Sequence, residues 1–215
     1  PQLQTLLALP PSHFVSFDDL RVHMRDEGPR DYPAPIVLLH GTADSLFTWD
    51  GWAAQLRGQR RVIRVDLPGF GLTGPDPQAD YSIDADVRFV AAVLDQLQLP
   101  AVVLGGNSLG GEIAWRSALA MPQRVRQLIL VDSTGYPLAP QKVPLAFTLA
   151  RMPMLAPVLE RLLPRGLVLA SLRSLYGDPS RVTPELVDRY YEMALRGGNR
   201  RALVQRLQAM AGDDS

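Results

Sequence analysis

The feature that most constrains the fold is an alternation of short strand-like runs with longer stretches of helical spacing. Residues 36–39 read Ile-Val-Leu-Leu, an uninterrupted apolar run typical of a strand that is covered on both faces. Further strand-like runs follow at 62–67, 101–105 and 128–131, and apolar residues at helical spacing stand between them. Units of this length favour right-handed crossovers onto one sheet. The sequence therefore predicts an α/β fold with a mostly parallel sheet and flanking helices.

A leading hairpin and three helices complete the prediction for this part of the chain. Two short strands are expected to pair as the hairpin, and Ser82 is a suitable N-cap for the longest helix. The hairpin strands are predicted at 14–17 and 20–24, and the helices at about 49–57, 83–97 and 109–121.

The sequence changes character at Tyr136-Pro137. From there on it shows helical stretches interrupted by prolines and no strand-like run. We therefore expect an α/β core at residues 1–136, a helical lid at 137–205, and the start of the return to the core at 206–215.

The predicted lid carries an excess of positive charge. Residues 137–205 hold ten basic and five acidic side chains, so this segment carries +5 and the rest of the chain −5. A solvated helical surface and an anion-attracting lid both fit this charge. Thr183 as N-cap, followed by Pro184, predicts the clearest lid helix, which continues to about Arg196.

Charge and residue usage exclude several kinds of site. The 215 residues carry 22 basic and 22 acidic side chains, whereas a nucleic-acid-binding protein would show a basic excess. Without cysteine, the chain has no disulfide and no thiolate ligand or nucleophile. Its histidines, His13, His23 and His40, lack the short helical spacing of metal-ligand pairs. We expect no nucleic-acid partner, no metal and no cofactor.

The sequence constrains the location of the protein only loosely. No run of about 18 apolar residues is present to span a membrane. Pro1 is not an initiator methionine, so we expect that an upstream segment was removed. Membrane contact is expected only through such a segment. A cytoplasmic location is the expectation, with export or membrane anchoring left open.

One motif points to chemistry. Gly106-Asn107-Ser108-Leu109-Gly110 matches the pattern G-x-S-x-G and stands between a predicted strand and a predicted helix. This context is what a nucleophile elbow requires, because the turn is so tight that small residues must flank the serine. The amide of Leu109 would lie at a helix N-terminus, which favours negative charge. The alternative is a serine that only caps the helix.

Two other glycine-rich motifs do not fit this segment. A dinucleotide fingerprint starting at Gly105 would need glycine where Asn107 stands, and a P-loop would need lysine where Gly111 stands. We therefore follow the interpretation of Ser108 as a nucleophile.

Three motifs, in this order and spacing, resemble the α/β-hydrolase superfamily. They are Leu38-Leu39-His40-Gly41, Asp66-Leu67-Pro68-Gly69-Phe70-Gly71 and Gly106-Asn107-Ser108-Leu109-Gly110-Gly111. Over about residues 14–136 the chain resembles the bacterial serine hydrolases that include carboxylesterases and meta-cleavage-product C–C hydrolases. The resemblance implies a lid inserted after the sixth strand. Serine at the elbow argues against the dehalogenase and epoxide-hydrolase branches, which use aspartate there.

The resemblance also implies an oxyanion hole. In this fold a second N–H comes from the loop after the strand at 36–39, and Thr42 is predicted to supply it. Gly41 would let the backbone turn toward Ser108. His40 is expected to brace this loop through hydrogen bonds, with a role as general base as the alternative. The expected partner is a small hydrophobic carbonyl compound.

The base and the acid that activate a serine are not evident. The family order is serine, acid, histidine, and no histidine follows Ser108. We therefore expect this chain to be the N-terminal part of a longer hydrolase. Alone, it should be inactive and should pair with a complementing C-terminal fragment or self-associate. Asp132, after the strand at 128–131, is a candidate acid or a structural cap of the following turn.

Other polar side chains are expected to be structural. Asp66 precedes Pro68-Gly69 and fits a loop-forming aspartate better than a catalytic one. His13 and His23 lie in the leading strands and are predicted to be surface residues.

Apolar residues of the lid suit a hydrophobic substrate or the packing of the lid against itself. These residues are Met152, Met154, Leu155, Leu159, Leu162 and Leu163. In the core, Trp52 is predicted to be buried, and Trp49 or Phe47 to form a wall of the pocket.

The sequence thus predicts a serine hydrolase that cleaves an ester, lactone or C–C bonded diketone through an acyl-enzyme on Ser108. A non-catalytic ligand-binding or interaction protein on the same scaffold is the alternative, because the chain shows no base for the serine.

Overall fold

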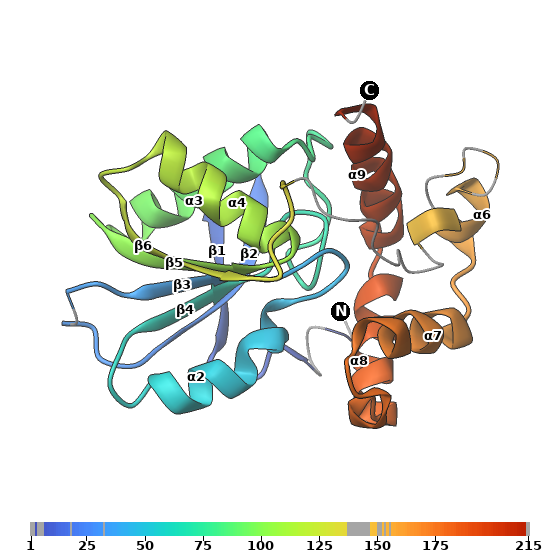
Figure 1. Ribbon diagram of the computed structural model, residues 1–215, viewed down its shortest axis with the longest axis horizontal. Helices are drawn as coiled ribbons and strands as arrows, with labels where there is room; N and C mark the ends of the chain where they lie inside the picture. The colour runs from blue at the N-terminus through green and yellow to red at the C-terminus, as the bar shows by residue number, and fades with distance from the viewer. Residues whose placement is uncertain are drawn as a thin grey trace.

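A computed structural model shows one six-stranded sheet with helices on both faces (Figure 1). It describes residue 3 and residues 7–17, 19–31, 33–136, 147–149, 152, 154 and 156–213. The strands lie in the order β1-β2-β4-β3-β5-β6. Their bounds are β1 Ser12–Phe17, β2 Leu20–Glu27, β3 Ile36–Leu39, β4 Val62–Val65, β5 Val102–Asn107 and β6 Val125–Val131.

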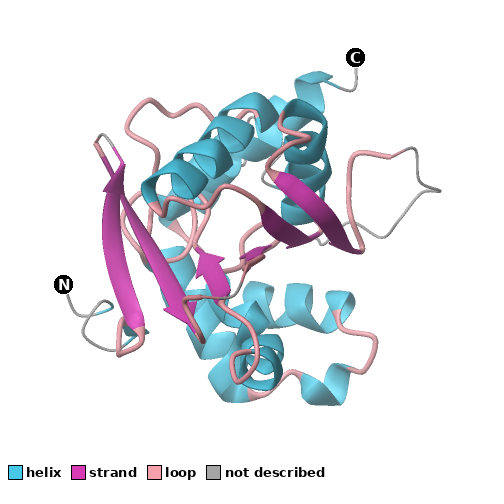
Figure 2. Ribbon diagram, turned by 90° about the vertical axis from the view of Figure 1, so that its left-hand side faces the viewer, coloured by secondary structure: helices cyan, strands magenta, loops and turns pink. Residues whose placement is uncertain are grey.

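The sheet is mostly parallel, as predicted for this α/β fold. Strand β3 pairs in parallel with β4 and β5, and β5 pairs in parallel with β6. The predicted hairpin of β1 and β2 is confirmed, and it adds to the sheet through an antiparallel pairing of β2 with β4. Figure 2 shows this hairpin at one edge of the sheet, near the N-terminus.

Helices α3 and α4 cover one face of the sheet and α2 covers the other, whereas α6 to α9 lie together beside the sheet (Figure 1). Their bounds are η1 Leu46–Trp49, α2 Asp50–Leu56, α3 Ile83–Gln96, α4 Leu109–Ala120, α6 Ala156–Arg161, α7 Arg165–Leu175, η2 Pro179–Arg181, α8 Pro184–Leu195 and α9 Asn199–Asp213. Both predicted N-caps are confirmed, because the hydroxyl groups of Ser82 and Thr183 each accept a backbone N–H three residues on.

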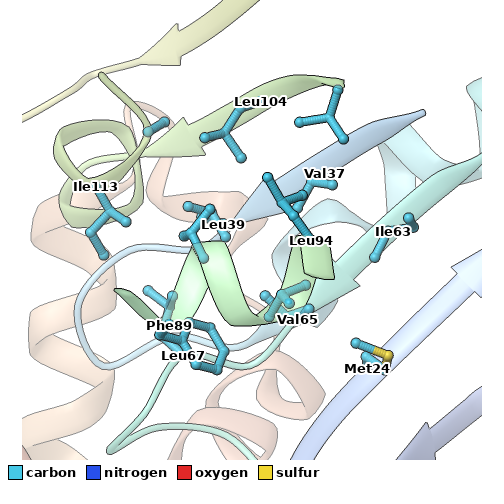
Figure 3. Close-up of a cluster of buried hydrophobic side chains, with 14 of the residues drawn as sticks. Met24, Val37, Leu39, Ile63, Val65, Leu67, Phe89, Leu94, Leu104 and Ile113 are labelled. Carbon is cyan, nitrogen blue, oxygen red and sulfur yellow. The ribbon is translucent and has the colours of Figure 1, made fainter. Parts of the chain in front are cut away.

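Alternate residues of β3 point to opposite layers. Val37 and Leu39 belong to the buried cluster between the sheet and helices α3 and α4 (Figure 3). Ile36 and Leu38 pack with Trp49 under η1 and α2. Each such side chain contributes about 2 kcal/mol through removal of apolar surface from water. The prediction of a strand covered on both faces is therefore confirmed.

Several expectations differ from the structure. Trp52 was predicted to be buried but is 41% exposed, because the helix turns Trp49 inward and leaves Trp52 at the surface. Strand β6 begins at Val125, earlier than predicted, because polar residues are tolerated on an exposed edge strand. Helix α9 runs across residue 205, and the expected end of the lid at this residue stays a prediction.

The apolar residues of the expected lid are described only in part. Met152, Met154 and Leu162 are exposed, and Leu163 is half-buried. Residues 137–146, Leu155 and the side chain of Leu159 lie outside the described residues, so a shared apolar underside stays a prediction.

A buried ion pair holds the last helix on the α/β core. Arg206 of α9 donates two hydrogen bonds to the carboxylate of Asp86 on α3, and both side chains are buried. Its guanidinium also donates to the carbonyl oxygens of Pro68 and Tyr81. Helix α9 is therefore fixed against the loop that follows β4.

The described part of the chain contains neither a membrane-spanning helix nor a metal-binding cluster. None of the helices there is both long and apolar enough to cross a membrane. In the same residues, no three histidine, aspartate or glutamate side chains lie close enough together to hold a metal ion.

Candidate active site

The carboxyl ends of three parallel strands bring the predicted site residues together. Leu39 at the end of β3 lies beside Gly106 of β5, and Asn107 lies beside Val131 of β6. The loops that follow these strands therefore meet at one edge of the sheet, where ligands bind in open α/β folds.

The backbone of Ser108 has the sharp conformation expected of a nucleophile elbow. Its dihedral angles are φ 51° and ψ −117°, outside the regions that side-chain-bearing residues favour. The surroundings hold this conformation, because the Ser108 N–H donates to the carbonyl of Val131 over 3.0 Å. In the other direction, the Ser108 carbonyl accepts the N–H groups of Gly111, Glu112 and Thr134. The hydroxyl makes no capping hydrogen bond and the residue is half-buried.

The glycines beside Ser108 allow strand, turn and helix to approach closely. A Cβ atom on Gly106 would lie 2.0 Å from the carbonyl oxygen of Gly110. One on Gly110 would lie 2.4 Å from the carbonyl oxygen of Leu39. Both distances are impossible for real atoms, so no larger residue fits either position without moving the backbone.

The two predicted oxyanion donors are the backbone N–H groups of Thr42, in the loop after β3, and of Leu109, at the start of α4. Leu109 is the first residue of α4, so its N–H has no acceptor within the helix. The N–H of Thr42 forms no hydrogen bond within the described residues. Gly41 lies against the elbow, because a Cβ atom there would be 3.3 Å from Cβ of Ser108. Thr42 and Leu109 therefore stand on the two segments that meet at Ser108, and their role as oxyanion donors stays a prediction.

His40 braces the loop that follows β3, as the sequence predicted. Its Nε2 accepts the N–H of Leu67 over 2.9 Å, so that nitrogen carries no proton. Its Nδ1 therefore bears the proton and donates to the carbonyl of Gly41 over 2.8 Å. Both ring nitrogens are occupied and the side chain is fully buried, which leaves no nitrogen to take a proton from Ser108.

Asp66 is a loop-forming aspartate, as predicted. Its partner is His23, which lies in the interior and not on the surface as expected. Its carboxylate accepts the N–H groups of Leu46 and Leu72 and the Nδ1–H of His23, each over 2.7 Å. His23 was predicted on the surface and is fully buried, because η1 and the loop after β4 cover its strand. His13 is exposed, as expected.

Burial opposes the ionisation of Asp66, yet the hydrogen bonds from His23 and from the Leu46 N–H help to outweigh burial, and the pKa of the carboxyl is below its usual value. Asp66 is therefore a buried carboxylate that anchors two loops.

Asp132 directly follows β6 at the level of Ser108. Its backbone has a φ of 46° and its side chain is exposed. The next turn is tied to the elbow, because the N–H of Thr134 donates to the Ser108 carbonyl over 3.2 Å. The backbone thus places Asp132 near the serine, and its role as an acid stays a prediction.

Asp44 also lies near the site, although no motif in the sequence marks it. It follows Thr42 by two residues and accepts the N–H of Ser45 over 2.7 Å. The nearby hydroxyl groups of Thr48 and of Tyr190 on α8 favour its ionised form. Desolvation by the surrounding protein raises the pKa of Asp44 in spite of these donors. In the sequence, its position two residues after Thr42 is the feature that could have identified it.

The two aromatic residues predicted to wall a pocket are both buried. Phe47 packs with Leu46, Leu72 and Met193 where α8 meets the core. Trp49 packs under α2, on the other face of β3. Phe47 therefore lies at the contact between the core and the C-terminal helices, and a role for either residue as a pocket wall stays a prediction.

Comparison with known proteins identifies relatives of this chain. A protein family described as "alpha/beta hydrolase fold" matches residues 34–204. The 2-hydroxy-6-oxo-2,4-heptadienoate hydrolase of Pseudomonas putida is 38% identical over 104 residues, which cover 47% of this chain and 38% of that protein. The haloalkane dehalogenase of Psychrobacter cryohalolentis is 38% identical over 119 residues, which cover 52% of this chain and 39% of that protein.

A solved structure extends the similarity to nearly the whole chain. The crystal structure of wild-type Cfl2 from Burkholderia cenocepacia matches with a TM-score of 0.83 at 24% identity, over 94% of this chain and 71% of that one. This match shows the fold. The chain spans about two fifths of the length of the curated relatives that it matches.

Proposed function

Because the chain belongs to the alpha/beta hydrolase family, we propose that it is a serine hydrolase with Ser108 as its nucleophile. The observation that carries this proposal is the elbow conformation of Ser108, with φ 51° and ψ −117°, at the N-terminus of α4. A serine that only caps a helix needs no such conformation, since ordinary N-caps have extended backbones and bond their own helix. Ser108 makes no capping bond.

In the proposed reaction, Ser108 Oγ forms a bond to the carbonyl carbon of the substrate while its proton passes to a base. The carbonyl oxygen becomes an oxyanion, which accepts hydrogen bonds from the N–H groups of Thr42 and Leu109. Collapse of this intermediate expels the alcohol, which takes the proton, and leaves an acyl-enzyme. Water then releases the acid and restores Ser108. Each oxyanion donor contributes about 3 kcal/mol to stabilising the transition state.

The base in this proposal lies outside the three histidines of the chain. His40 uses both ring nitrogens, His23 is buried against Asp66, and His13 lies on the distant hairpin. We therefore propose that another polypeptide segment supplies the histidine. Asp132, which the backbone places near Ser108, is the candidate acid within the chain.

A C–C bonded diketone is the second candidate substrate class. It is favoured by the similarity to the heptadienoate hydrolase, and the proposed nucleophile and oxyanion donors serve either carbonyl. The similarity to a haloalkane dehalogenase does not favour halide displacement, because the elbow of this chain carries a serine and not a carboxylate.

Hydrolysis assays on the whole protein test the proposal. We expect turnover of p-nitrophenyl acetate or of a 2-hydroxy-6-oxo-dienoate, and loss of that turnover in Ser108→Ala. Which of the two is cleaved faster decides between the ester and diketone classes. Equal rates in wild-type protein and Ser108→Ala would refute the proposal.

A further inference from the structure

The end of β6 and the turn after it hold the backbone of Ser108 from two sides. The carbonyl oxygen of Val131, the last residue of β6, accepts the Ser108 N–H over 3.0 Å. Three residues further on, the N–H of Thr134 donates to the Ser108 carbonyl oxygen over 3.2 Å. Ser108 has a φ of 51°, which a residue with a Cβ atom keeps only where its surroundings hold it. The position of Thr134 therefore affects the conformation of the elbow.

Two side chains of α4 hold Thr134 in turn. Its hydroxyl donates to Oε2 of Glu112 over 3.0 Å, and its carbonyl oxygen accepts the indole N–H of Trp115 over 3.2 Å. Glu112 is only 9% exposed, so its bond to Thr134 is largely shielded from water. The turn lies close to both side chains, because a Cβ atom on Gly135 would lie 2.8 Å from Cδ of Glu112 and from Cζ2 of Trp115. Thr134 is thus bonded through its N–H, its carbonyl and its hydroxyl.

The alternative role for Glu112 is an ion pair on the surface of α4. Arg116, one turn further along the helix, brings Nη2 to 3.8 Å from Oε1 of Glu112. The Arg116 side chain is half exposed, and ion pairs of this kind contribute little because water screens them. The hydrogen bond to Thr134 is shorter and uses the other carboxylate oxygen. The contact of Glu112 with the turn is therefore the stronger of the two.

We propose that Glu112 is a positioning residue for Ser108, which acts through Thr134 and not on the substrate. The proposal rests on Ser108 being the nucleophile of the proposed hydrolase. By holding the turn after β6, Glu112 keeps Ser108 in the elbow conformation, and the same turn follows directly on Asp132, the candidate acid. A reacting group displaced by about 1 Å reacts about a hundredfold more slowly. Loss of the bond should therefore slow the chemical step and leave substrate binding unchanged.

Kinetics of the whole protein test this role with two pairs of variants. In each pair one change removes the hydrogen bond and the other keeps it. The pairs are Thr134→Val with Thr134→Ser, and Glu112→Ala with Glu112→Gln, whose carboxamide oxygen still accepts. We expect Thr134→Val and Glu112→Ala to lower kcat by about 10- to 100-fold with KM unchanged, and their partners to keep most of the wild-type kcat. Arg116→Gln is the control, because it removes only the ion pair, and it should also keep kcat.

A spectroscopic measurement follows the turn without any catalytic step. In protein labelled with ¹⁵N-tryptophan, the indole N–H of Trp115 reports its bond to the carbonyl of Thr134, and Trp115→Phe assigns the signal. We expect this resonance to shift in Thr134→Val and in Glu112→Ala. It should stay close to its wild-type position in Thr134→Ser and in Glu112→Gln. A resonance that moves equally in Thr134→Val and Thr134→Ser would contradict the role of the hydroxyl.

The kinetic outcomes decide whether Glu112 and Thr134 act as one unit. If they do, the double variant Glu112→Ala, Thr134→Val should lose no more kcat than either single variant. Independent losses that multiply in the double variant would overturn the proposal, as would a wild-type kcat in Thr134→Val while Ser108→Ala is inactive. Failure of the hydrolase proposal would appear differently, as full turnover in Ser108→Ala. Circular dichroism checks that each variant is folded.

Discussion

The imidazole of His23 donates a 2.7 Å hydrogen bond from Nδ1 to Oδ2 of Asp66, and both side chains are fully buried. This pair joins strand β2 to the loop after β4. Through the N–H groups of Leu46 and Leu72, the same carboxylate holds the start of η1 and the loop after β4. The scaffold of the candidate site therefore depends on a buried charge far from the nucleophile in sequence.

The His23–Asp66 pair makes stability depend on pH. The pKa of Asp66 is below its usual 3.8 in the folded chain, so its contribution is complete above about pH 3.8 and is lost as pH falls below that value. Asp66→Asn should lower the free energy of unfolding at neutral pH by about 3 kcal/mol and weaken its decline at acid pH. Urea unfolding across the acid range measures both effects. The exposed Asp19→Asn is the control and should follow the wild type.

The strained backbone of Ser108 predicts an unusual gain in stability. Glycine adopts φ 51° and ψ −117° without the clash that a Cβ atom brings, so Ser108→Gly should raise the free energy of unfolding by about 1 kcal/mol. Ser108→Ala keeps the Cβ atom and should leave stability near the wild-type value. Urea midpoints compare the two variants. Equal midpoints for glycine and alanine would show that the turn stores no strain.

Helix α9 should depend on its buried ion pair. Arg206→Met leaves Asp86 buried without its partner and should lower the free energy of unfolding by about 3 to 5 kcal/mol. The double variant Arg206→Met, Asp86→Leu removes the stranded carboxyl and should recover most of that loss. A double-mutant cycle in urea gives the coupling. Additive effects of the two single changes would contradict a buried pair.

The edge of the sheet predicts association of the isolated chain. Strand β6 is last in the sheet order, and Leu128 and Leu130 on it are 39% and 42% exposed. Such an edge pairs readily with another strand, so we expect dimers or larger species in size-exclusion chromatography. Leu128→Lys should shift the chain toward monomer, whereas Leu119→Lys on α4 should not. A monomeric wild-type chain at high concentration would contradict this expectation.

The elbow could be predicted from the sequence because its cause is local. Gly106 and Gly110 stand within five residues of one another, and their spacing alone requires the close approach that the structure shows. The strand at 36–39 was equally predictable from the sequence, because its apolar run needs cover on both faces. The bracing role of His40 followed from its place at the end of that strand.

The remaining features depend on contacts between distant segments. His23 is buried by elements more than 20 residues further along the chain, which a strand pattern does not reveal. Asn199 bonds the carbonyl of Gly71, 128 residues away, and no motif marks it. Contacts of this kind were therefore not predictable from the sequence.

We propose that Ser108 is an activated nucleophile, and covalent labelling is the experiment that decides this. The whole protein and its Ser108→Ala variant are incubated with a fluorophosphonate, and the adduct is located by peptide mass spectrometry. We predict one adduct, on the peptide that contains Ser108, and none on that peptide in the variant. A folded whole protein whose Ser108 remains unlabelled would contradict the claim and favour a non-catalytic role for this scaffold.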